Sequence, residues 1–260
     1  MYYQPDEIIR SRRRTLSIEI QKDGRFVVRA PYYVNSAEIE AFVRSKQAWI
    51  AKTLEKCSER VSKILDVDFS AGSCIPFLGR LIKLDYHEGR SMKLIGADKL
   101  NSLPADEFSS FSVLEGVTLL LPSPAFRREG ISLGGEAYPA EQELEENRRM
   151  VNSWYRHQSA SVLKARTALY AARMGLKYSR VGITKAKTSW GSCNAKYGIN
   201  YSLHLICVSV SEIDYVVVHE LSHILHRDHS AAFYKEIGKV IPDYKTRSSA
   251  LDRNAWVLDI

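Results

Sequence analysis

Cysteine is scarce in this sequence. The 260 residues include four cysteines, at positions 57, 74, 193 and 207, and no two of them form a Cys-x-x-Cys pair. A disulfide framework and a thiolate zinc cage both need a regular set of cysteines at short spacing. The sequence indicates neither, and we expect four reduced thiols that lie mostly in the core.

Long hydrophobic runs are also absent. The longest unbroken ones have four or five residues, as in 215–218, whereas a membrane-spanning helix needs about 18. The first seven residues lack the charged and apolar regions of a secretory signal. Because 45% of the residues are hydrophobic, the chain can still bury a sizeable core. We therefore expect a soluble, cytoplasmic protein with no membrane partner.

Acidic residues are missing from one long stretch, although the whole chain has 30 of them against 37 basic residues, a net charge of +7. Between Asn147 and Ser211, eleven Lys or Arg residues occur without any Asp or Glu. Some of these cations can be solvated or pair with acids elsewhere. The functional interpretation is a positive rim around a cleft that takes anionic substrates or partners. The cations that would form this rim are Arg180, Lys185, Lys187 and Lys196.

The first half of the chain has the pattern of a small sheet-rich unit. Two alternating runs flank Asp23-Gly24 within residues 16–30, which predicts a β-hairpin. Residues 36–40 resemble a helix capping box, and apolar residues then recur at helical spacing over 39–54. We expect this helix to cover one face of the sheet and further short strands to follow over 74–121.

A boundary is predicted before the second half. Residues 122–139 carry three prolines and three glycines without periodicity, as is typical of a linker. A helix-favouring stretch with an acidic first turn follows over 140–174 and ends at Gly175. The alternating residues of 181–207, joined through 194–198, predict a second hairpin.

A histidine cluster carries the strongest chemical signal. Four of the seven histidines fall between His219 and His229, and the first part reads His219-Glu-Leu-Ser-His223. At 100° per residue, His219 and His223 lie about 40° apart on one helical face, so both imidazoles can reach one ion. Glu220 is rotated by about 100°, where a carboxylate can take a proton from metal-activated water without binding the metal.

The alternative explanation of this motif is a core helix whose histidines bond to carbonyl groups. The flanks do favour a buried helix, because apolar residues surround the motif and Ser211-x-x-Asp214 predicts a capping box. A third histidine favours the metal site. His226 and His229 compete for that position, and we prefer His229, since a helix that ends near His226 lets His229 swing back. His226 is then a hydrogen-bonded residue beside the ligands.

Motifs along almost the whole chain occur in a characteristic order. They are the segments 9–17 (Ile-Arg-Ser-Arg-Arg-Arg-Thr-Leu-Ser), 42–50, 76–80, 190–193 (Trp-Gly-Ser-Cys), 213–223 and 242–244. With them the chain resembles the YgjP-like metallopeptidase family, zincin-like metal-dependent hydrolases related to SprT-like proteins. This sequence departs from the family pattern at Ser189, Ser202 and Tyr234, so its substrate preference is less transferable than its metal binding.

The patterns along the chain, together with the resemblance, predict an α+β protein in two domains. A small sheet-rich domain over 1–130 would precede a zincin-like catalytic domain over 131–260, with an antiparallel hairpin or sheet and the metal helix. By position, the family's zinc ligands would be His219, His223 and His229 and its general base Glu220, with one Zn²⁺ per chain.

Four further residues are candidates for substrate binding. Trp190 and Ser192 belong to a Trp-Gly-Ser-Cys segment that could shape the cleft floor or only pack, and Tyr244 and Arg247 could stabilise an oxyanion or only belong to a packed C-terminal helix. The basic run 10–14 resembles a nucleic-acid patch, but we interpret it as a solvated strand edge that blocks aggregation.

Three functions are compatible with this sequence. The favoured one is a zinc metallopeptidase acting on peptide or protein substrates. The acid-free basic segment motivates the second, a metal-dependent hydrolase of nucleotides or other phosphate anhydrides. The third is a nucleic-acid-associated protein like the SprT-like relatives.

Overall fold

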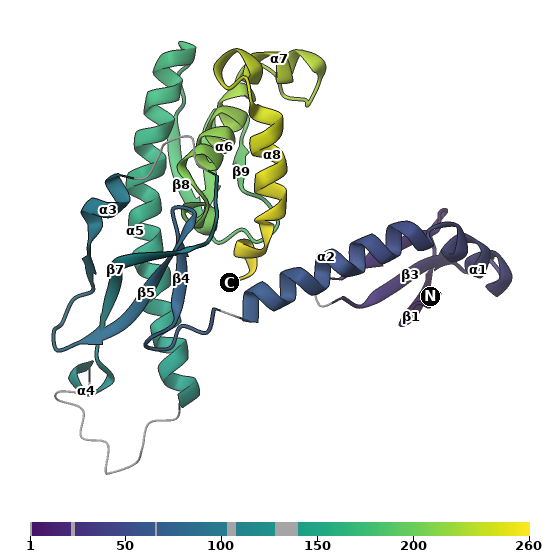
Figure 1. The fold of residues 1–260 in the computed structure, drawn as a ribbon. Helices are drawn as coiled ribbons and strands as arrows, with labels where there is room; N and C mark the ends of the chain where they lie inside the picture. The colour runs from purple at the N-terminus through teal and green to yellow at the C-terminus, as the bar shows by residue number, and fades with distance from the viewer. Residues whose placement is uncertain (1, 22–23, 66, 103–107, 128–139) are drawn as a thin grey trace. The chain divides into compact units, whose positions relative to one another are not determined.

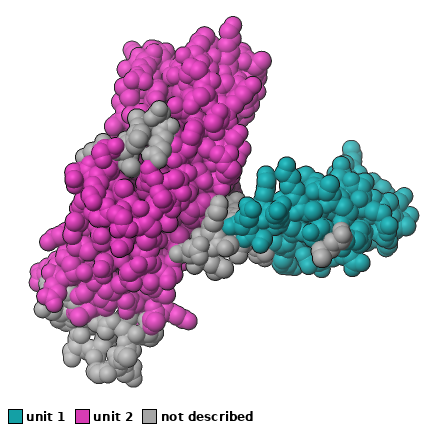
Figure 2. Space-filling view, viewed as in Figure 1, with its two compact units in different colours: residues 1–66 teal, residues 67–260 magenta. Residues whose placement is uncertain are grey.

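The structure is a computed structural model that describes residues 2–21, 24–65, 67–102, 108–127 and 140–260 (Figure 1). Helices and small sheets alternate along these residues, so the protein is α+β, as predicted. The chain divides into two compact units, unit 1 (residues 1–66) and unit 2 (residues 67–260) (Figure 2). No helix in the described ranges is both long and apolar enough to cross a membrane.

Unit 1 is a small sheet covered by helices. Its elements are β1 (Glu7–Ser11), β2 (Ser17–Ile20), β3 (Phe26–Pro31), α1 (Ser36–Ser45) and α2 (Gln47–Leu65). The central strand β3 runs parallel to β1 and antiparallel to β2. The β2–β3 pairing confirms the predicted hairpin, although Asp23 of its turn lies outside the described residues.

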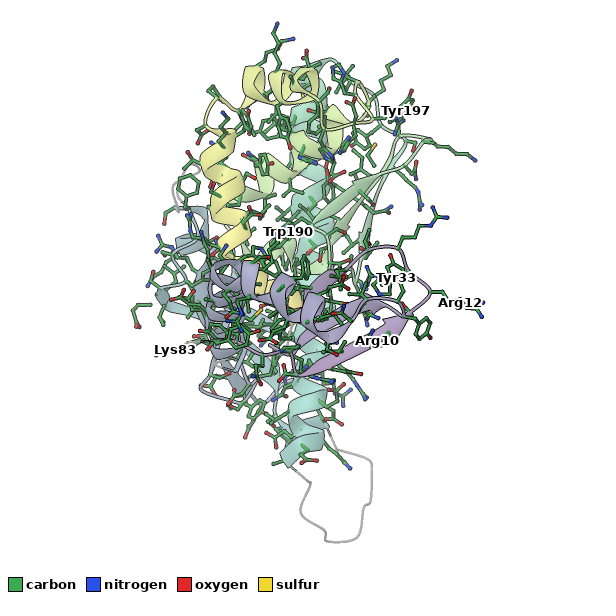
Figure 3. All side chains as sticks on the ribbon, turned by 90° about the vertical axis from the view of Figure 1, so that its right-hand side faces the viewer. Arg10, Arg12, Tyr33, Lys83, Trp190 and Tyr197 are labelled. Carbon is green, nitrogen blue, oxygen red and sulfur yellow. The ribbon has the colours of Figure 1, made fainter. Side chains whose placement is uncertain are left out.

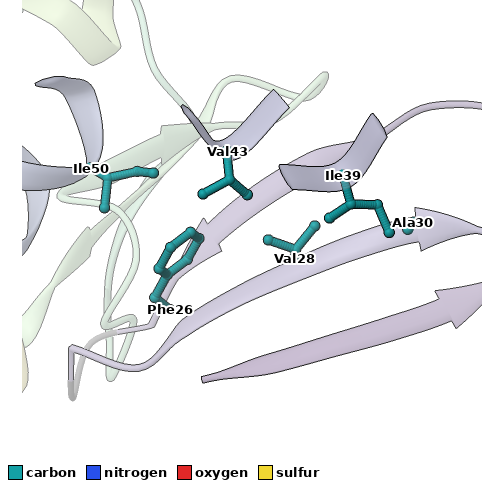
Figure 4. Packing of buried hydrophobic residues seen from close by; sticks show 6 residues of the cluster. All are labelled: Phe26, Val28, Ala30, Ile39, Val43 and Ile50. Carbon is teal, nitrogen blue, oxygen red and sulfur yellow. The ribbon is translucent and has the colours of Figure 1, made fainter. Parts of the chain in front are cut away.

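The core of unit 1 lies between this sheet and the helices. Alternate residues of β3 point to one face, where they meet apolar residues of α1 and α2 (Figure 4). The buried residues of this core are Phe26, Val28, Ala30, Ile39, Val43 and Ile50.

The helix predicted over 39–54 is two helices, because the backbone leaves the helical conformation at Lys46. In an unbroken helix, the backbone N–H of Gln47 would donate to the Val43 carbonyl. Here that carbonyl accepts from the Gln47 side-chain amide at 3.3 Å.

Unit 2 begins with a four-stranded sheet that confirms the strands predicted over 74–121. Its strand order is β4-β5-β7-β6, with β5 and β7 as parallel central strands. The elements of this part are β4 (Cys74–Phe77), β5 (Arg80–His87), β6 (Lys93–Ile95), α3 (Ala97–Asn101), β7 (Val113–Pro122) and α4 (Pro124–Arg127).

The long helix α5 (Ala140–Met174) has the predicted bounds. It packs against the four-stranded sheet, since the buried Tyr155 hydroxyl donates to the Pro76 carbonyl of β4 at 2.5 Å. The chain leaves α5 at Gly175, whose φ of +66° suits a residue without a side chain.

The division between the two units falls between residues 66 and 67, which differs from the boundary predicted near residue 130. The reason is the packing of the four-stranded sheet. Its core is shared with α5, and the loop after β4 bonds to the segment that precedes the histidine helix, where Leu78 N–H donates to the Ile206 carbonyl at 2.9 Å. Proline and glycine in residues 122–139 marked a connection within unit 2 rather than a division between units.

A second small sheet of unit 2 consists of β8 (Arg180–Thr184), β9 (Gly191–Cys193) and β10 (Gly198–Ser202), in the order β8-β10-β9. The hairpin around 194–198 joins β9 and β10, whereas β8 runs parallel to β10. The prediction that residues 181–207 form one hairpin is therefore wrong. Residues 203–207 form a short 3₁₀ helix, η1 (Leu203–Cys207), whose first turn is capped by the Ser202 side chain.

The remaining elements are helical: α6 (Val210–Ser222), α7 (Ala231–Val240), α8 (Tyr244–Arg253) and η2 (Ala255–Asp259). The capping box of α6 is formed by Ser209 and Glu212, not by Ser211 and Asp214. The side chain of Asp214 instead accepts two hydrogen bonds from the Arg166 guanidinium on α5, at 2.6 and 2.5 Å. One cation of the acid-free segment thus has an internal acidic partner.

The four cysteines are free thiols, as predicted. Cys207 is buried, but Cys57, Cys74 and Cys193 are partly exposed, so the expectation that most of them lie in the core is wrong.

Candidate metal site

Helix α6 holds the first part of the histidine motif in the interior of unit 2. Residues 211–218 are buried along its length, and the helix ends at Ser222, with His223 as its C-cap. His219 and His223 therefore lie one turn apart at the C-terminal end of a firmly packed helix. Glu220, between them in sequence, is buried with 4% of its surface exposed.

The chain turns back after α6 and returns His229 to the helix end. The Asp228 carboxylate accepts from the Ser230 backbone N–H at 3.3 Å, and Ser230 is the N-cap of α7. Arg227 anchors the turn, because its guanidinium donates to the Asn194 carbonyl at 2.9 Å and lies 5.1 Å from the ring centre of Tyr197 in the β9–β10 hairpin.

Three imidazoles converge as a result. One nitrogen from each of His219, His223 and His229 lies within 4.8 Å of the other two. The Nε2 atoms of His219 and His229 are 3.2 Å apart. Tetrahedral zinc with bonds of about 2.0–2.1 Å places two imidazole nitrogens about 3.3 Å apart. The His219–His229 separation matches this value, and the three nitrogens together lie close enough to hold one metal ion.

Phe233 of α7 lies against all three imidazoles. Its ring centre is 4.9 Å from that of His219, 4.6 Å from His223 and 5.0 Å from His229, and its side chain is fully buried. Sequence reasoning did not identify this residue. The sequence signal that could have indicated Phe233 was its position, four residues after His229 and within the first turn of α7.

The electrostatics of the cluster favour neutral imidazoles. Burial, and then the neighbouring His223 and His229, lower the pKa of His219 to about 4, and burial lowers the pKa of His223. Both rings are thus neutral at pH 7 and can offer a lone pair to a metal. The Nδ1 atom of His223 lies 3.1 Å from the His226 carbonyl, a contact that directs the other ring nitrogen toward the cluster.

The carboxyl group of Glu220 sits in an apolar environment. Burial raises the pKa of Glu220 to about 8. Its Oε2 atom is buried and has no hydrogen-bond partner among the described residues. An unpartnered buried carboxyl oxygen is costly in a merely structural residue. It is typical of a group that receives a proton or a substrate.

Gly191 of β9 provides the space that Glu220 occupies. A methyl group added at Gly191 would lie 2.7 Å from Oε1 and 2.8 Å from Cγ of Glu220. Sequence reasoning proposed the segment 190–193 as a possible cleft floor, with Trp190 and Ser192 as its binding residues, but did not predict the contact of Gly191 with Glu220.

The comparison with family models decides what kind of protein has this site. The model of the YgjP-like metallopeptidase domain matches residues 14–109 and 124–254, most of the chain. The chain belongs to the YgjP-like family. This confirms the predicted resemblance and assigns the protein to a family of metallopeptidase type. No curated protein and no solved structure matches the chain.

The other predicted site residues of this YgjP-like protein lie at different distances from the histidines. Trp190 and Ser192 are the sequence neighbours of Gly191, the residue whose added methyl group would meet Glu220. Tyr244 stacks on Tyr234 with ring centres 5.8 Å apart, and the Tyr234 ring centre is 6.4 Å from that of His229. One ring thus separates Tyr244 from the cluster.

Arg247 is not brought to the histidines. Its guanidinium donates to the Asp243 carboxylate at 3.0 Å and to the Ser211 carbonyl at 3.0 Å. Ser211 is in the first turn of α6, eight residues before His219 and thus about 12 Å away along the helix axis. These contacts favour the interpretation that Arg247 fastens α8 to the start of α6.

Proposed function

We propose that this YgjP-like protein is a zinc-dependent hydrolase, and most specifically a metallopeptidase. One arrangement carries the proposal: three imidazole nitrogens within 4.8 Å of one another, next in sequence to a buried carboxyl group without a hydrogen-bond partner. Three histidines with an open fourth position are the usual donor set of catalytic zinc. The exposed His229 leaves one side of the cluster open to solvent.

The roles of the protein groups follow from their environments. His219, His223 and His229 would hold the ion, and zinc, when bound, supplies Lewis acidity that polarises a carbonyl and makes water a stronger acid. Glu220 would accept the proton that the attacking water loses and pass it to the leaving amine. Burial raises the pKa of Glu220 to about 8, and a nearby cation would lower it toward the working pH.

A nucleotide hydrolase is the second candidate, and the acid-free basic segment favours it. Arg180, Lys185 and Lys196 of this segment are exposed on or beside the small sheet that carries Gly191. These cations would bind the phosphate groups of a nucleotide, and the same metal site would hydrolyse the phosphate anhydride bond. The metal-loaded protein is incubated with a panel of peptides and nucleoside triphosphates. Cleavage of a peptide bond supports the metallopeptidase, and cleavage of a phosphate anhydride bond supports the nucleotide hydrolase.

The proposal predicts one zinc ion per chain in protein purified without chelator. Elemental analysis measures this stoichiometry, and a His219→Ala, His223→Ala double variant provides the control, with its zinc content expected near zero. Protein that carries no metal and takes up no added zinc would contradict the proposal.

Gly191→Ala is predicted to reduce hydrolysis about 100-fold while zinc stays bound, because displacement of a catalytic group by about 1 Å has this order of effect. The new methyl group would meet the Glu220 side chain and force it to move. The measurement is kcat beside zinc content and melting temperature.

Gly182→Ala is the matched control for this substitution. Gly182 lies on β8 of the same sheet, and its added methyl group would meet the Asn200 side chain instead. The prediction fails if Gly191→Ala keeps full activity, or if both variants lose activity together with their folded structure.

A further inference from the structure

The basic run at the start of the chain has neighbours that the sequence alone does not reveal. Strands β1 and β3 are parallel, with Ser11 opposite Pro31 at their carboxyl ends. The segments that follow these strands, 12–14 and 32–34, therefore leave the sheet at the same end. Figure 3 shows Arg10, Arg12 and Tyr33 together there. We call Arg12, Arg14, Tyr32 and Tyr33 the tyrosine–arginine surface.

Hydrogen bonds fix the backbone beneath this surface. The Arg10 guanidinium donates to the Val34 carbonyl at 2.5 Å and lies 3.4 Å from the carbonyls of Pro31 and Tyr32. The Tyr33 hydroxyl donates to the Arg14 carbonyl at 3.1 Å. These hydrogen bonds hold the two segments together, so the backbone that carries the surface is fixed.

The tyrosines are unusually open to solvent. Tyr32 and Tyr33 are 65% and 75% exposed, whereas Ala30 just before them is fully buried. Neither ring therefore contributes its area to the core of unit 1. Two adjacent exposed aromatic rings offer flat faces on which a planar ligand can stack.

The arginines beside the tyrosines differ from other arginines of unit 1. Arg12 and Arg14 are exposed and form no ion pair with any described residue. Three other arginines of unit 1 are neutralised by glutamates: Arg25 by Glu7 at 3.0 Å, Arg29 by Glu19 at 2.6 Å and Arg44 by Glu40 at 2.6 Å. Positive charge without a counter-ion is thus concentrated beside the two rings.

We propose that the tyrosine–arginine surface binds single-stranded nucleic acid, with the rings stacked on bases and the guanidinium groups on phosphates. Cations that follow the backbone, together with aromatic faces for successive bases, are the features of sequence-tolerant single-strand binding. An acidic peptide would use the cations but not the two flat faces. This surface belongs to unit 1, so the proposal is independent of the hydrolytic site in unit 2.

The test uses the full-length protein and fluorescein-labelled oligo(dT) and oligo(U) of about 20 nucleotides, longer than one expected binding site. Fluorescence anisotropy gives Kd at about 50 mM and about 200 mM NaCl. An Arg12→Gln, Arg14→Gln double variant should bind about tenfold more weakly, and the slope of log K against log salt should become shallower by about 1.4. The two oligonucleotides distinguish DNA from RNA as the preferred strand.

Three further sets of variants complete the test. Arg25→Gln with Arg44→Gln removes the same charge from paired arginines and should leave Kd within about twofold. Tyr32→Leu with Tyr33→Leu should weaken binding at least about 30-fold, because both faces on which bases stack are removed. Tyr32→Phe retains the ring of Tyr32 and leaves the Tyr33–Arg14 hydrogen bond in place, so it should bind as well as the original protein.

Several outcomes would overturn the proposal. The first is that the protein binds neither oligonucleotide at the lower salt concentration. The second is that the Arg12/Arg14 and Arg25/Arg44 double variants lose affinity equally. The third is that the protein binds a duplex as tightly as a single strand and that the Tyr32/Tyr33→Leu variant binds unchanged. Binding to anionic phosphatidylserine vesicles but to neither oligonucleotide would assign the surface to a membrane instead. Loss of binding only on replacement of Arg180, Lys185, Lys187 and Lys196 would place the nucleic-acid contact in unit 2.

Discussion

Replacing Glu220 by glutamine is expected to lower hydrolysis about 10³-fold while the bound zinc stays in place. The amide has the shape of the carboxyl group, so it fits beside Gly191, where the space for a side chain is set by the glycine. It cannot accept a proton from water, which removes the proposed step. Activity on the best peptide of the screen and zinc content are measured on the same preparation.

Glu236→Gln is the matched control, because it makes the same chemical change on α7, where the carboxylate accepts from Lys239 at 2.6 Å. Full activity is expected for that variant. Undiminished turnover in Glu220→Gln would remove Glu220 from the mechanism, and loss of zinc would give it a structural role in the metal site instead.

A second measurement compares the original protein with Glu220→Gln after zinc is chelated, and follows the free energy of unfolding against pH. Burial raises the folded-state pKa of Glu220 to about 8 from an ordinary value of 4.5. The folded state then holds a proton that the unfolded state has released, so the contribution of Glu220 to stability is lost as pH rises from 4.5 toward 8. Glu220→Gln lacks this loss, and its free energy of unfolding should fall less over that range.

The second large effect concerns the third histidine. His229→Ala is expected to weaken zinc binding by more than about 100-fold, beyond the effect of removing an outer partner of a ligand. His226→Ala should leave the affinity within about tenfold, because His226 contributes its backbone carbonyl to His223, and alanine keeps that carbonyl. Competition with a chromophoric chelator measures both affinities.

Equal losses in His226→Ala and His229→Ala would contradict this division of roles. The melting temperature of the metal-free proteins provides the control for folding. His229 is exposed, so its removal should leave the metal-free protein as stable as the original, and a large decrease would show that the loss of zinc follows from unfolding.

Local sequence patterns were sufficient to predict several elements of the structure. The stretch 140–174 forms the helix that its residues predict. The alternation around Asp23-Gly24 correctly predicts the β2–β3 pairing. A helical spacing of four residues also places His219 and His223 on one face of α6 before any tertiary contact is known. In each case the signal lies within one segment, because backbone periodicity and turn preference act over a few residues.

Tertiary packing decided the rest. Residues 122–139 do not separate the units, because the β4–β7 sheet shares its core with α5. Residues 203–207 leave the strand direction of β10 to form η1. The pairing of parallel strands β1 and β3, not the basic run itself, brings Tyr33 beside Arg14.

The histidine site divides in the same way. The sequence by itself singled out the histidines that we propose as zinc ligands and the carboxyl group next to them in the chain. Only the tertiary structure decided that His229 approaches His219, that Phe233 lies behind the three rings and that Gly191 makes room for Glu220. The physical reason is that these contacts join different elements, and close packing between elements depends on the shape of both partners, which no periodicity within one segment records.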